Sequence, residues 1–386
     1  MADQNFDVVV IGMGYMGFPM AVIMAEAGLN VCGIDINQEK VTKVNNGICP
    51  IQEVGLDERF ESVYKTKKLI ASTVIPKAKS YIISVPTPEI NHVCDLEYVV
   101  SAAKTLAEVI DNDSLVILES TVRPNTCKDI LKPIFDEKNK KVMIAYCPER
   151  AIPGNTLHEL VNNDRIIGGL TPEASELAFA LYSKFIKGNI FKTNAVTAEC
   201  CKLMENTFRD INIALANEFS EILSEHGVNA IEAINLANKH PRVNILTPGV
   251  GVGGHCIAVD PWFLVENTNK GDLVRLARKI NNERPSVIAQ KIMNKTSIHN
   301  NKIGILGLSY KPDVDDLRHS PSLDLIAELE KLGAKVQVCD PFIEVFERPL
   351  LNLKQIEEWS DFLVIATNHS CFKDFKSEKL IDLFLP

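Results

Sequence analysis

The segment "DVVVIGMGYMGFPMAVIMAEAG", residues 7–28, constrains the fold more than any other part of the chain. A short apolar run leads into three glycines spaced as GxGxxG, and a helix-like stretch follows that ends at Gly28. Strand, turn and helix in this order are typical of a dinucleotide-binding fold. Gly12 would permit the tight turn, Gly14 would let a pyrophosphate approach, and Gly17 would allow close helix packing. The sequence therefore predicts a phosphate site at the start of this helix.

A carboxylate follows at the place where such a fold holds a ribose. The segment "NVCGID" predicts a second strand that ends at Asp35, 18 residues after Gly17. A carboxylate here accepts hydrogen bonds from a ribose diol and repels a 2'-phosphate. Alone, Asp35 could be a solvated carboxylate at a strand end. Combined with the glycine motif, it predicts NAD rather than NADP as the cofactor.

The remaining pattern predicts an α/β protein with two Rossmann-like, doubly wound domains. Further strand-like runs alternate with helical stretches, which indicates a parallel sheet covered on both faces: "SYIISVPTP", "SLVILEST" and "KVMIAYCPER". From about residue 195 to Gly227 the chain lacks proline and internal glycine, which predicts one long helix. The strand, turn and helix pattern begins again near residue 302. We expect three domains, 1–194, 195–298 with an all-helical character, and 299–386.

Composition excludes several classes of protein. A chain of 386 residues exceeds one ordinary core, and its 46% hydrophobic and 24% charged residues are typical of a soluble globular protein. No apolar run approaches the roughly 18 residues of a membrane helix, and the first residues lack the features of a signal peptide, so we expect a cytoplasmic protein. Ten scattered cysteines indicate neither a disulfide framework nor a metal site. The net charge of -9 argues against a nucleic-acid partner.

The predicted long helix carries polar residues on one stripe. Lys202, Asn206, Arg209 and Asn217 recur at helical spacing. On a surface helix this would be a solvated face. The dense apolar residues around them favour a buried or cleft-facing position for Lys202 and Asn206, where an ammonium and an amide one turn apart could both donate to an oxyanion.

A single cysteine follows a glycine-rich run in "PGVGVGGHCIAVDPWFL", residues 248–264. Cys256 could be a small, inert buried residue. Glycines, however, lose the most backbone entropy on ordering, and a run of them is suited to bringing phosphates and a sugar against backbone amides. The thiol would then lie within reach of a ligand. His255, Asp260 or Lys202 could influence its ionisation.

Eight segments in order along nearly the whole chain resemble the UDP-glucose/UDP-N-acetyl-hexosamine 6-dehydrogenase family. They are "GMGYMG", "SVPTP", "ESTVRPNT", "CPERAIPGN", "AECCKLMENTFRDINIALANE", "HPRVN", "GVGVGGHCIAVDPWFL" and "LGLSYKPDVDDLRHSP". Within the family, "GGHCIAVDPWF" and "HPRVNI" are most similar to the branch that oxidises UDP-N-acetyl-D-mannosamine. The UDP-glucose branch commonly has serine where this chain has His255.

The resemblance implies an NAD-dependent, four-electron oxidation of a sugar C6 alcohol to a carboxylate, for polysaccharide precursor synthesis. It implies that Cys256 forms a thiohemiacetal and then a thioester, which water hydrolyses. By the same resemblance Lys202 and Asn206 would stabilise oxyanions, and Asp260 would assist proton transfer. Two further residues complete the implied catalytic set: Glu149, which would deliver a proton or water, and Thr121, which would hold water and touch the nicotinamide.

Binding residues and domain roles follow from the resemblance as well. Beside the glycines and Asp35, NAD would contact Tyr15, Met16, Thr87, Thr121 and Arg318. The UDP-sugar would contact Arg150, Ala151, Lys202, Asn206, Arg209, His240, Arg242, Gly253, Tyr310 and Lys311. Domain 1–194 would bind NAD, 195–298 would carry the catalytic loop and the contact of a homodimer or larger homo-oligomer, and 299–386 would bind the UDP-sugar. Arg242 would cross from a second subunit.

Three alternatives stay open at this point. A UDP-N-acetylglucosamine or UDP-glucose 6-dehydrogenase would use the same chemistry on a sugar that differs at C2. A nucleotide-sugar or NAD sensor without turnover would not need the set Lys202, Asn206, Cys256 and Asp260. A two-electron dehydrogenase of the 3-hydroxyacid or 6-phosphogluconate type would not need Cys256 and would release one NADH per substrate.

Overall fold

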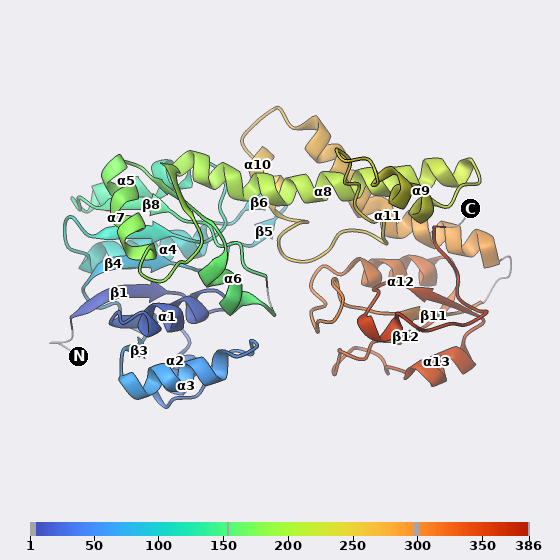
Figure 1. Cartoon of the computed structure of the whole chain (residues 1–386), viewed down its shortest axis with the longest axis horizontal. Coiled ribbons are helices and arrows are strands. Elements are labelled where there is room, and N and C mark those ends of the chain that lie inside the picture. Colours follow the sequence, from blue (N-terminus) through green and yellow to red (C-terminus); the bar gives the residue numbers. More distant parts are fainter. Residues whose placement is uncertain (1–4, 153, 297–300, 385–386) are drawn as a thin grey trace. The chain divides into compact units, whose positions relative to one another are not determined.

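The computed structural model describes residues 5–152, 154–296 and 301–384 (Figure 1). The chain folds into two compact units, Met1–Met204 and Glu205–Pro386. Helix α8 (Ala195–Glu225) is one continuous helix that contributes to both units. Its 31 residues confirm the long helix that the sequence predicts from about residue 195 to Gly227.

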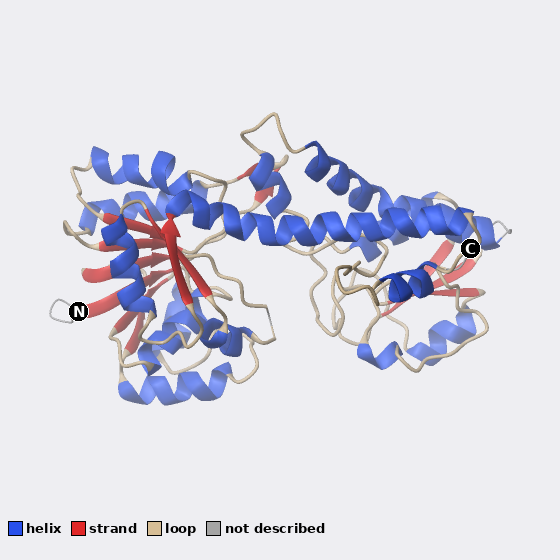
Figure 2. Cartoon of the chain, turned by 45° about the horizontal axis from the view of Figure 1, so that its top comes forward, coloured by secondary structure: helices blue, strands red, loops and turns tan. Residues whose placement is uncertain are grey.

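The first unit is built on a sheet of eight strands in the order β10-β9-β8-β7-β4-β1-β2-β3. Figure 2 shows the strands in red with helices beside them. Neighbours are parallel from β3 to β8, which confirms the expected Rossmann-like arrangement. The strands are β1 (Phe6–Ile11), β2 (Val31–Ile34), β3 (Leu69–Ser72), β4 (Ala78–Ile83), β7 (Leu115–Leu118), β8 (Met143–Tyr146), β9 (Arg165–Gly169) and β10 (Ile190–Asn194). A separate antiparallel pair is formed by β5 (Glu89–Ile90) and β6 (Val93–Cys94).

The expectation of a parallel sheet is wrong at one edge. Strand β9 pairs antiparallel with β8, and β10 then pairs parallel with β9. Neither strand is evident in the sequence. Strand β9 ends in Gly168 and Gly169, where a Cβ would lie 2.3 Å from the carbonyl oxygens of Asn194 and Thr171. Glycine is required there by close packing, and glycine is also the residue that weakens a strand pattern in a sequence.

Helices cover both faces of this sheet, because alternate residues of its strands enter two different cores. Val8 and Val10 of β1 belong to one core, and Val9 and Ile11 belong to the other. The helices of this unit are α1 (Gly17–Glu26), α2 (Gln38–Asn45), α3 (Leu56–Thr66), α4 (Glu97–Val109), a π-helical turn (Cys127–Leu131), α5 (Lys132–Glu137), α6 (Thr156–Asn162) and α7 (Pro172–Tyr182). The unit is therefore doubly wound, as expected.

The second unit joins helices to a small parallel sheet in the order β12-β11-β13. After α8 come α9 (Ala230–Ala237), α10 (Asp260–Val265) and α11 (Asp272–Thr296). The sheet and its helices are β11 (Lys302–Leu306), α12 (Pro321–Lys331), β12 (Lys335–Cys339), α13 (Leu353–Trp359), β13 (Phe362–Ile365) and a short 3-10 turn (Ser370–Phe372). This confirms the second α/β region that the sequence predicts from near residue 302.

Buried polar contacts hold α8 against α11. Arg278 Nη1 lies 2.6 Å from Asp210 Oδ1, and both side chains are almost fully buried. Asn281 Nδ2 donates to Asp210 Oδ1 at 2.9 Å, and Asn217 Nδ2 donates to Asn281 Oδ1 at 3.0 Å. Asn217 Oδ1 also accepts from the Gly249 amide at 2.9 Å, at the start of the glycine-rich loop. Asn217, at the C-terminal end of the polar stripe on α8, thus has a structural role.

Across the described part of the chain, no helix is both long enough and apolar enough to cross a membrane.

Candidate active site

The loop between β1 and α1 is shaped by two close backbone contacts. Gly12 has φ +101°, a left-handed conformation that favours glycine, and a Cβ there would lie 2.2 Å from the Ser84 carbonyl oxygen. A Cβ on Gly17 would lie 1.9 Å from the Gly12 carbonyl oxygen. Packing within the protein therefore requires both glycines. They bring the start of α1 directly against the turn, as a phosphate site on a helix N-terminus needs.

Gly14 differs from its neighbours. A Cβ at this position would meet no atom within 4 Å, so protein packing does not require glycine. Its carbonyl oxygen accepts the Phe18 amide at 3.1 Å, at the first turn of α1. The open space lies beside helix amides that can donate to an anion. The loop therefore fits the pyrophosphate of a dinucleotide, with room that a side chain would fill.

Asp35 directly follows β2 and is held toward the glycine loop. Its Oδ2 accepts from the Met13 amide at 3.2 Å and lies 2.7 Å from Lys40 Nζ, while Oδ1 accepts from the Asn37 amide at 2.9 Å. Burial by itself would raise the pKa of Asp35, but these hydrogen bonds and the charge of Lys40 outweigh burial and lower it. Asp35 is thus an ionised acceptor beside the glycine loop, and its contact with a ribose stays a prediction. Sequence reasoning missed Lys40.

Glu149 follows β8 and is fixed from both carboxylate oxygens. Oε1 accepts from the amides of Arg150 and Ala151, both at 2.6 Å. Oε2 lies 2.6 Å from Nη2 of Arg165, whose side chain is only 2% exposed. Arg150 donates to the Asp164 carbonyl. The three residues predicted from "PERA" therefore share one turn.

A second carboxylate lies buried beside this group. Tyr182 Oη donates to Glu119 Oε1 at 2.5 Å, and Glu119 Oε2 has no hydrogen-bond partner among the described residues. Burial, with the charge of Glu149 added, raises the pKa of Glu119 to about 7, although Arg165 and the Tyr182 hydrogen bond oppose the rise. The buried thiol of Cys147 completes the cluster, and burial raises its pKa to about 12.

Sequence reasoning missed Glu119, Arg165 and Tyr182. Glu119 stands two residues before Thr121 in the quoted segment "ESTVRPNT", which is a signal that could have identified it. Ser120, between them, exchanges two hydrogen bonds with the Val85 backbone at 2.9 and 2.7 Å. This contact brings the segment of Thr121 next to the segment that carries Thr87.

The thiol of Cys256 is exposed, which contradicts the alternative of an inert buried residue. The Cys256 carbonyl accepts from the amides of Val259 at 3.0 Å and Asp260 at 2.8 Å, in the turn that begins α10. Asp260 is 3% exposed, and its Oδ2 accepts from Asn206 Nδ2 at 2.6 Å. Asp260 thus holds the thiol loop to α8. Lys202 lies one helical turn before Asn206 and is also buried.

The glycines before Cys256 pack against the segment that follows β11. A Cβ on Gly253 would lie 2.2 Å from the His319 carbonyl oxygen, and one on Gly254, with φ +82°, would lie 2.6 Å from the Tyr310 ring. Partial burial and the nearby charges of Asp316 and Cys256 raise the pKa of Tyr310. Packing within the protein alone explains why glycine is needed at these two positions. Contact between the Gly253 backbone and a substrate stays a prediction.

The other predicted residues lie at exposed or half-buried positions. Arg318 is paired with Asp316, with Nη2 2.6 Å from Oδ2. Arg242 Nη2 lies 3.4 Å from His240 Nε2, so these two residues form a pair on the exposed loop after α9. Three further residues predicted to bind ligands are Arg209, exposed on α8, Tyr15, exposed after Gly14, and Lys311, half-buried after Tyr310.

Among the described residues, no three His, Cys, Asp or Glu side chains are grouped as a metal site would require.

Comparison with known proteins agrees with this geometry over the full chain. Models of the UDP-glucose/GDP-mannose dehydrogenase family match residues 6–186 as the NAD binding domain, 196–283 as the central domain and 304–384 as the UDP binding domain. The chain belongs to this family. Its first domain binds NAD, which confirms the predicted cofactor, and the family resemblance is confirmed with it.

Similar members of the UDP-glucose/GDP-mannose dehydrogenase family are known from archaea and bacteria. The UDP-N-acetyl-D-mannosamine dehydrogenase of Methanococcus maripaludis strain C7 is 44% identical, over 98% of this chain and 90% of that protein. The enzyme of the same name from Campylobacter jejuni is 42% identical, over 98% and 99%. The solved UDP-D-ManNAc dehydrogenase of Pyrococcus horikoshii is 40% identical, with a TM-score of 0.90 over 98% and 93% of the two chains.

Substitutions at Gly14 and Gly17, the second and third glycines of the GxGxxG loop, should separate ligand binding from packing. Gly14→Ala places a methyl group in open space, so the melting temperature should stay close to wild type while the Kd for NAD rises about tenfold or more. Gly17→Ala forces backbone apart and should lower both stability and affinity. Calorimetric titration with NAD and thermal melts measure the two effects. An unchanged NAD affinity in Gly14→Ala would contradict the assignment.

The raised pKa of Glu119 predicts a pH-dependent stability. Between about pH 4.5 and pH 7 the folded protein holds a proton that unfolded glutamate has lost, so the free energy of unfolding falls as pH rises through this window. Glu119→Gln should remove this decline, which is on the order of 3 kcal/mol. Urea denaturation of both proteins at several pH values measures it. Glu137→Gln, at an exposed position, is the control that should keep the wild-type slope. Equal slopes in wild type and Glu119→Gln would refute the prediction.

Proposed function

We propose that the chain is an NAD-dependent UDP-N-acetyl-D-mannosamine 6-dehydrogenase, which forms UDP-N-acetyl-D-mannosaminuronate for polysaccharide precursors. The observation that carries the proposal is the exposed Cys256 thiol, held by Asp260 next to Asn206, in a chain of this family. The 44% identity to UDP-N-acetyl-D-mannosamine dehydrogenase over nearly the full length supports the choice of sugar.

NAD fits the loop between β1 and α1. The space at Gly14 would take the pyrophosphate, and Asp35 would accept the ribose hydroxyls. When bound, NAD supplies the hydride acceptor, and two molecules of it take up the four electrons of the reaction. We assign further cofactor contacts to Tyr15, Met16, Thr87, Thr121 and Arg318.

The oxidation breaks two C–H bonds at C6 in separate steps. Loss of the first hydride, with loss of the hydroxyl proton, would turn the C6 alcohol into an aldehyde, and Cys256 would then prepare this aldehyde for the second hydride loss. Its thiolate sulfur forms a bond to the carbon of the C6 aldehyde, and the carbonyl oxygen takes up a proton as the thiohemiacetal forms. Loss of hydride from that carbon and of the hydroxyl proton leaves a thioester. Water then adds to the thioester carbon, and the carbon–sulfur bond breaks to give the carboxylate and the thiol.

The oxygen at C6 carries developing negative charge in these steps, and Lys202 and Asn206 would stabilise it. The side-chain amide of Asn206 donates one hydrogen to Asp260, and its second hydrogen could be donated to this oxygen. Asp260 would accept or return the proton near the thiol. Glu149, held by Arg165 and two backbone amides, would direct the hydrolytic water with the help of Thr121.

The UDP-sugar would be held by residues from several segments. We assign contacts to Arg150, Ala151, Lys202, Asn206, Arg209, His240, Arg242, Gly253, Tyr310 and Lys311. Arginines among them offer paired N–H donors that match phosphate oxygens. The match of residues 304–384 to the family's UDP binding domain supports the parts of this set that follow β11.

Helix α8 supports the proposal of a homodimer or larger homo-oligomer. It exposes apolar side chains at helical spacing, and their exposed fractions lie between 38% and 64%: Met204, Phe208, Leu215 and Ile222. A second copy of the chain would remove this surface from water. Arg242 would reach the substrate of that second copy. The predicted cytoplasmic location remains part of this proposal.

The choice of sugar is tested by initial rates of NAD reduction with UDP-N-acetyl-D-mannosamine, UDP-N-acetylglucosamine and UDP-glucose. We expect the first to have a kcat/KM at least about a hundredfold above the others, about 2.7 kcal/mol in transition-state energy, because one pocket must distinguish the configuration and the substituent at C2. Cys256→Ser should form no uronate. A preference for another sugar would contradict the assignment. Binding of NAD and UDP-sugars without turnover would favour a sensor.

A further inference from the structure

The α/β part of the second unit repeats the backbone construction of the first. Gly307 follows β11 with φ +87°, and a Cβ there would lie 2.3 Å from the Thr367 carbonyl oxygen, after the neighbouring strand β13. Gly12 makes the same contact with the strand next to β1, at 2.2 Å. Asp340 follows β12 and accepts from the Leu308 amide at 2.7 Å, as Asp35 accepts from the Met13 amide. The two aspartates are therefore equivalent in the fold.

The two aspartates differ in how far their side chains are exposed. The side chain of Asp35 keeps 11% of its surface exposed, whereas that of Asp340 keeps none. His369 closes Asp340 off, with Nε2 3.0 Å from Oδ2, and its ring stacks on Phe342 with centroids 4.8 Å apart. The position that would accept a ribose in the first unit is occupied by protein in the second. A nucleotide must be recognised in another way here.

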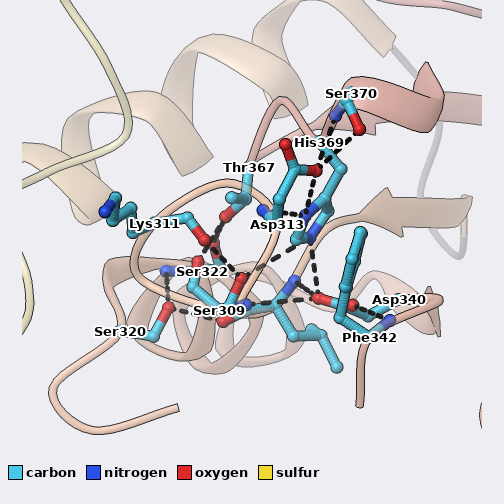
Figure 3. Close-up of polar contacts among 11 residues, drawn as sticks. Ser309, Lys311, Asp313, Ser320, Ser322, Asp340, Phe342, Thr367, His369 and Ser370 are labelled. Atoms are coloured by element: carbon cyan, nitrogen blue, oxygen red, sulfur yellow. Dashed lines mark hydrogen bonds and ion pairs between the residues drawn. The ribbon is translucent and has the colours of Figure 1, made fainter. Parts of the chain in front are cut away.

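His369 also binds the loop that follows β11 (Figure 3). Its Nδ1 accepts from the Asp313 amide at 2.8 Å, which assigns the ring hydrogen to Nε2 as the donor to Asp340. Asp313 Oδ1 in turn accepts from the Ser370 amide at 2.8 Å and from its hydroxyl at 3.0 Å. The imidazole thus connects the end of β12 to the far end of the loop. The near end is held by the amide of Leu308 on Asp340.

Hydroxyl groups fix the middle of the loop. Thr367 Oγ1 donates to the Ser309 carbonyl at 2.5 Å, and Ser309 Oγ donates to the Lys311 carbonyl at 2.8 Å. Every one of these bonds uses loop backbone or a small side chain. The long side chain of Lys311 takes no part in the contacts drawn in Figure 3. The ring of Tyr310 lies close to Gly254, two residues before Cys256.

We propose that His369 and Asp340 are positioning residues for the nucleotide-sugar site: together they fix the loop of residues 308–313, so that Tyr310 and Lys311 are presented to the UDP group. The proposal rests on the function assigned above to Tyr310 and Lys311. Neither His369 nor Asp340 touches the substrate, because both are fully buried. Their effect is therefore on binding of the nucleotide and on the order of the loop.

The test uses the full-length enzyme and UDP as the probe. In His369→Ala we expect the Kd for UDP and the KM for the sugar nucleotide to rise at least about tenfold, while kcat falls less than about threefold and the Kd for NAD changes less than about twofold. Hydrogen–deuterium exchange should become faster in residues 308–313. His369→Gln, which keeps an amide donor for Asp340, should recover part of the UDP affinity. If the alanine variant does not fold, the same measurements are made on His369→Asn.

Ile356→Ala is the matched control, because Ile356 is fully buried in the same unit, on α13, and belongs to none of these polar contacts. It should lower the melting temperature and leave the Kd for UDP within about twofold of wild type. Unchanged UDP affinity in the His369 variants would overturn the proposal. So would an equal loss of UDP affinity in Ile356→Ala. Because UDP binding needs no turnover, this result is independent of which sugar the wild-type enzyme oxidises.

Discussion

Direct contact between backbone segments, with no side chain between them, is the constraint on which the arrangement of the functional loops depends. Gly12 lets the turn after β1 touch the segment after β4, and Gly307 does the same for β11 and β13. Gly253 lets the thiol loop touch the His319 backbone. Any Cβ at these positions would have to displace backbone, which cannot move as a side chain can. Each loop is therefore positioned by main-chain contact.

Buried polar groups complete what these contacts begin. Asp260 fastens the loop of Cys256 to Asn206 on α8, and Asp340 fastens the loop of Tyr310 to β12. Asp260 accepts from Asn206, and Asp340 accepts from both Leu308 and His369, so leaving either buried carboxylate without these partners would be costly. Asp340 is fully buried and holds the loop of Tyr310 in place, whereas Asp260 lies next to the thiol for which we propose a proton-transfer role. The mechanism proposed for Cys256 needs this degree of order, because its sulfur would attack one carbon, stay bonded to it and then leave it.

Local patterns in the sequence predicted the parts of the molecule that depend on neighbouring residues. Short stretches of sequence are enough to indicate the glycine motif, Asp35 at the end of its strand and the long helix α8. The thiol loop was identified as well, but the packing of its glycines against Tyr310 was not, because more than fifty residues separate the two.

Contacts between distant segments escaped prediction for the same reason. Strand β9 ends in two glycines, and the residues of strand β10 are half-buried or exposed. The hydrophobic pattern that would indicate a strand is therefore weak in both. The pairs of Glu119 with Tyr182 and of His369 with Asp340 join residues 63 and 29 positions apart. An isolated glutamate or histidine in a sequence carries no sign of such a partner. The choice of sugar came from the resemblance, since no local pattern reports on the shape of a pocket.

We propose that the single thiol of Cys256 keeps one sugar bound between two successive oxidations. The most direct measurement is the amount of NADH released per mole of limiting UDP-N-acetyl-D-mannosamine at completion. Chemistry through Cys256 requires two NADH and a carboxylate product, because the intermediate aldehyde stays bonded to the sulfur until the second hydride has left. One NADH per sugar, with an aldehyde or ketone as product, would contradict the account.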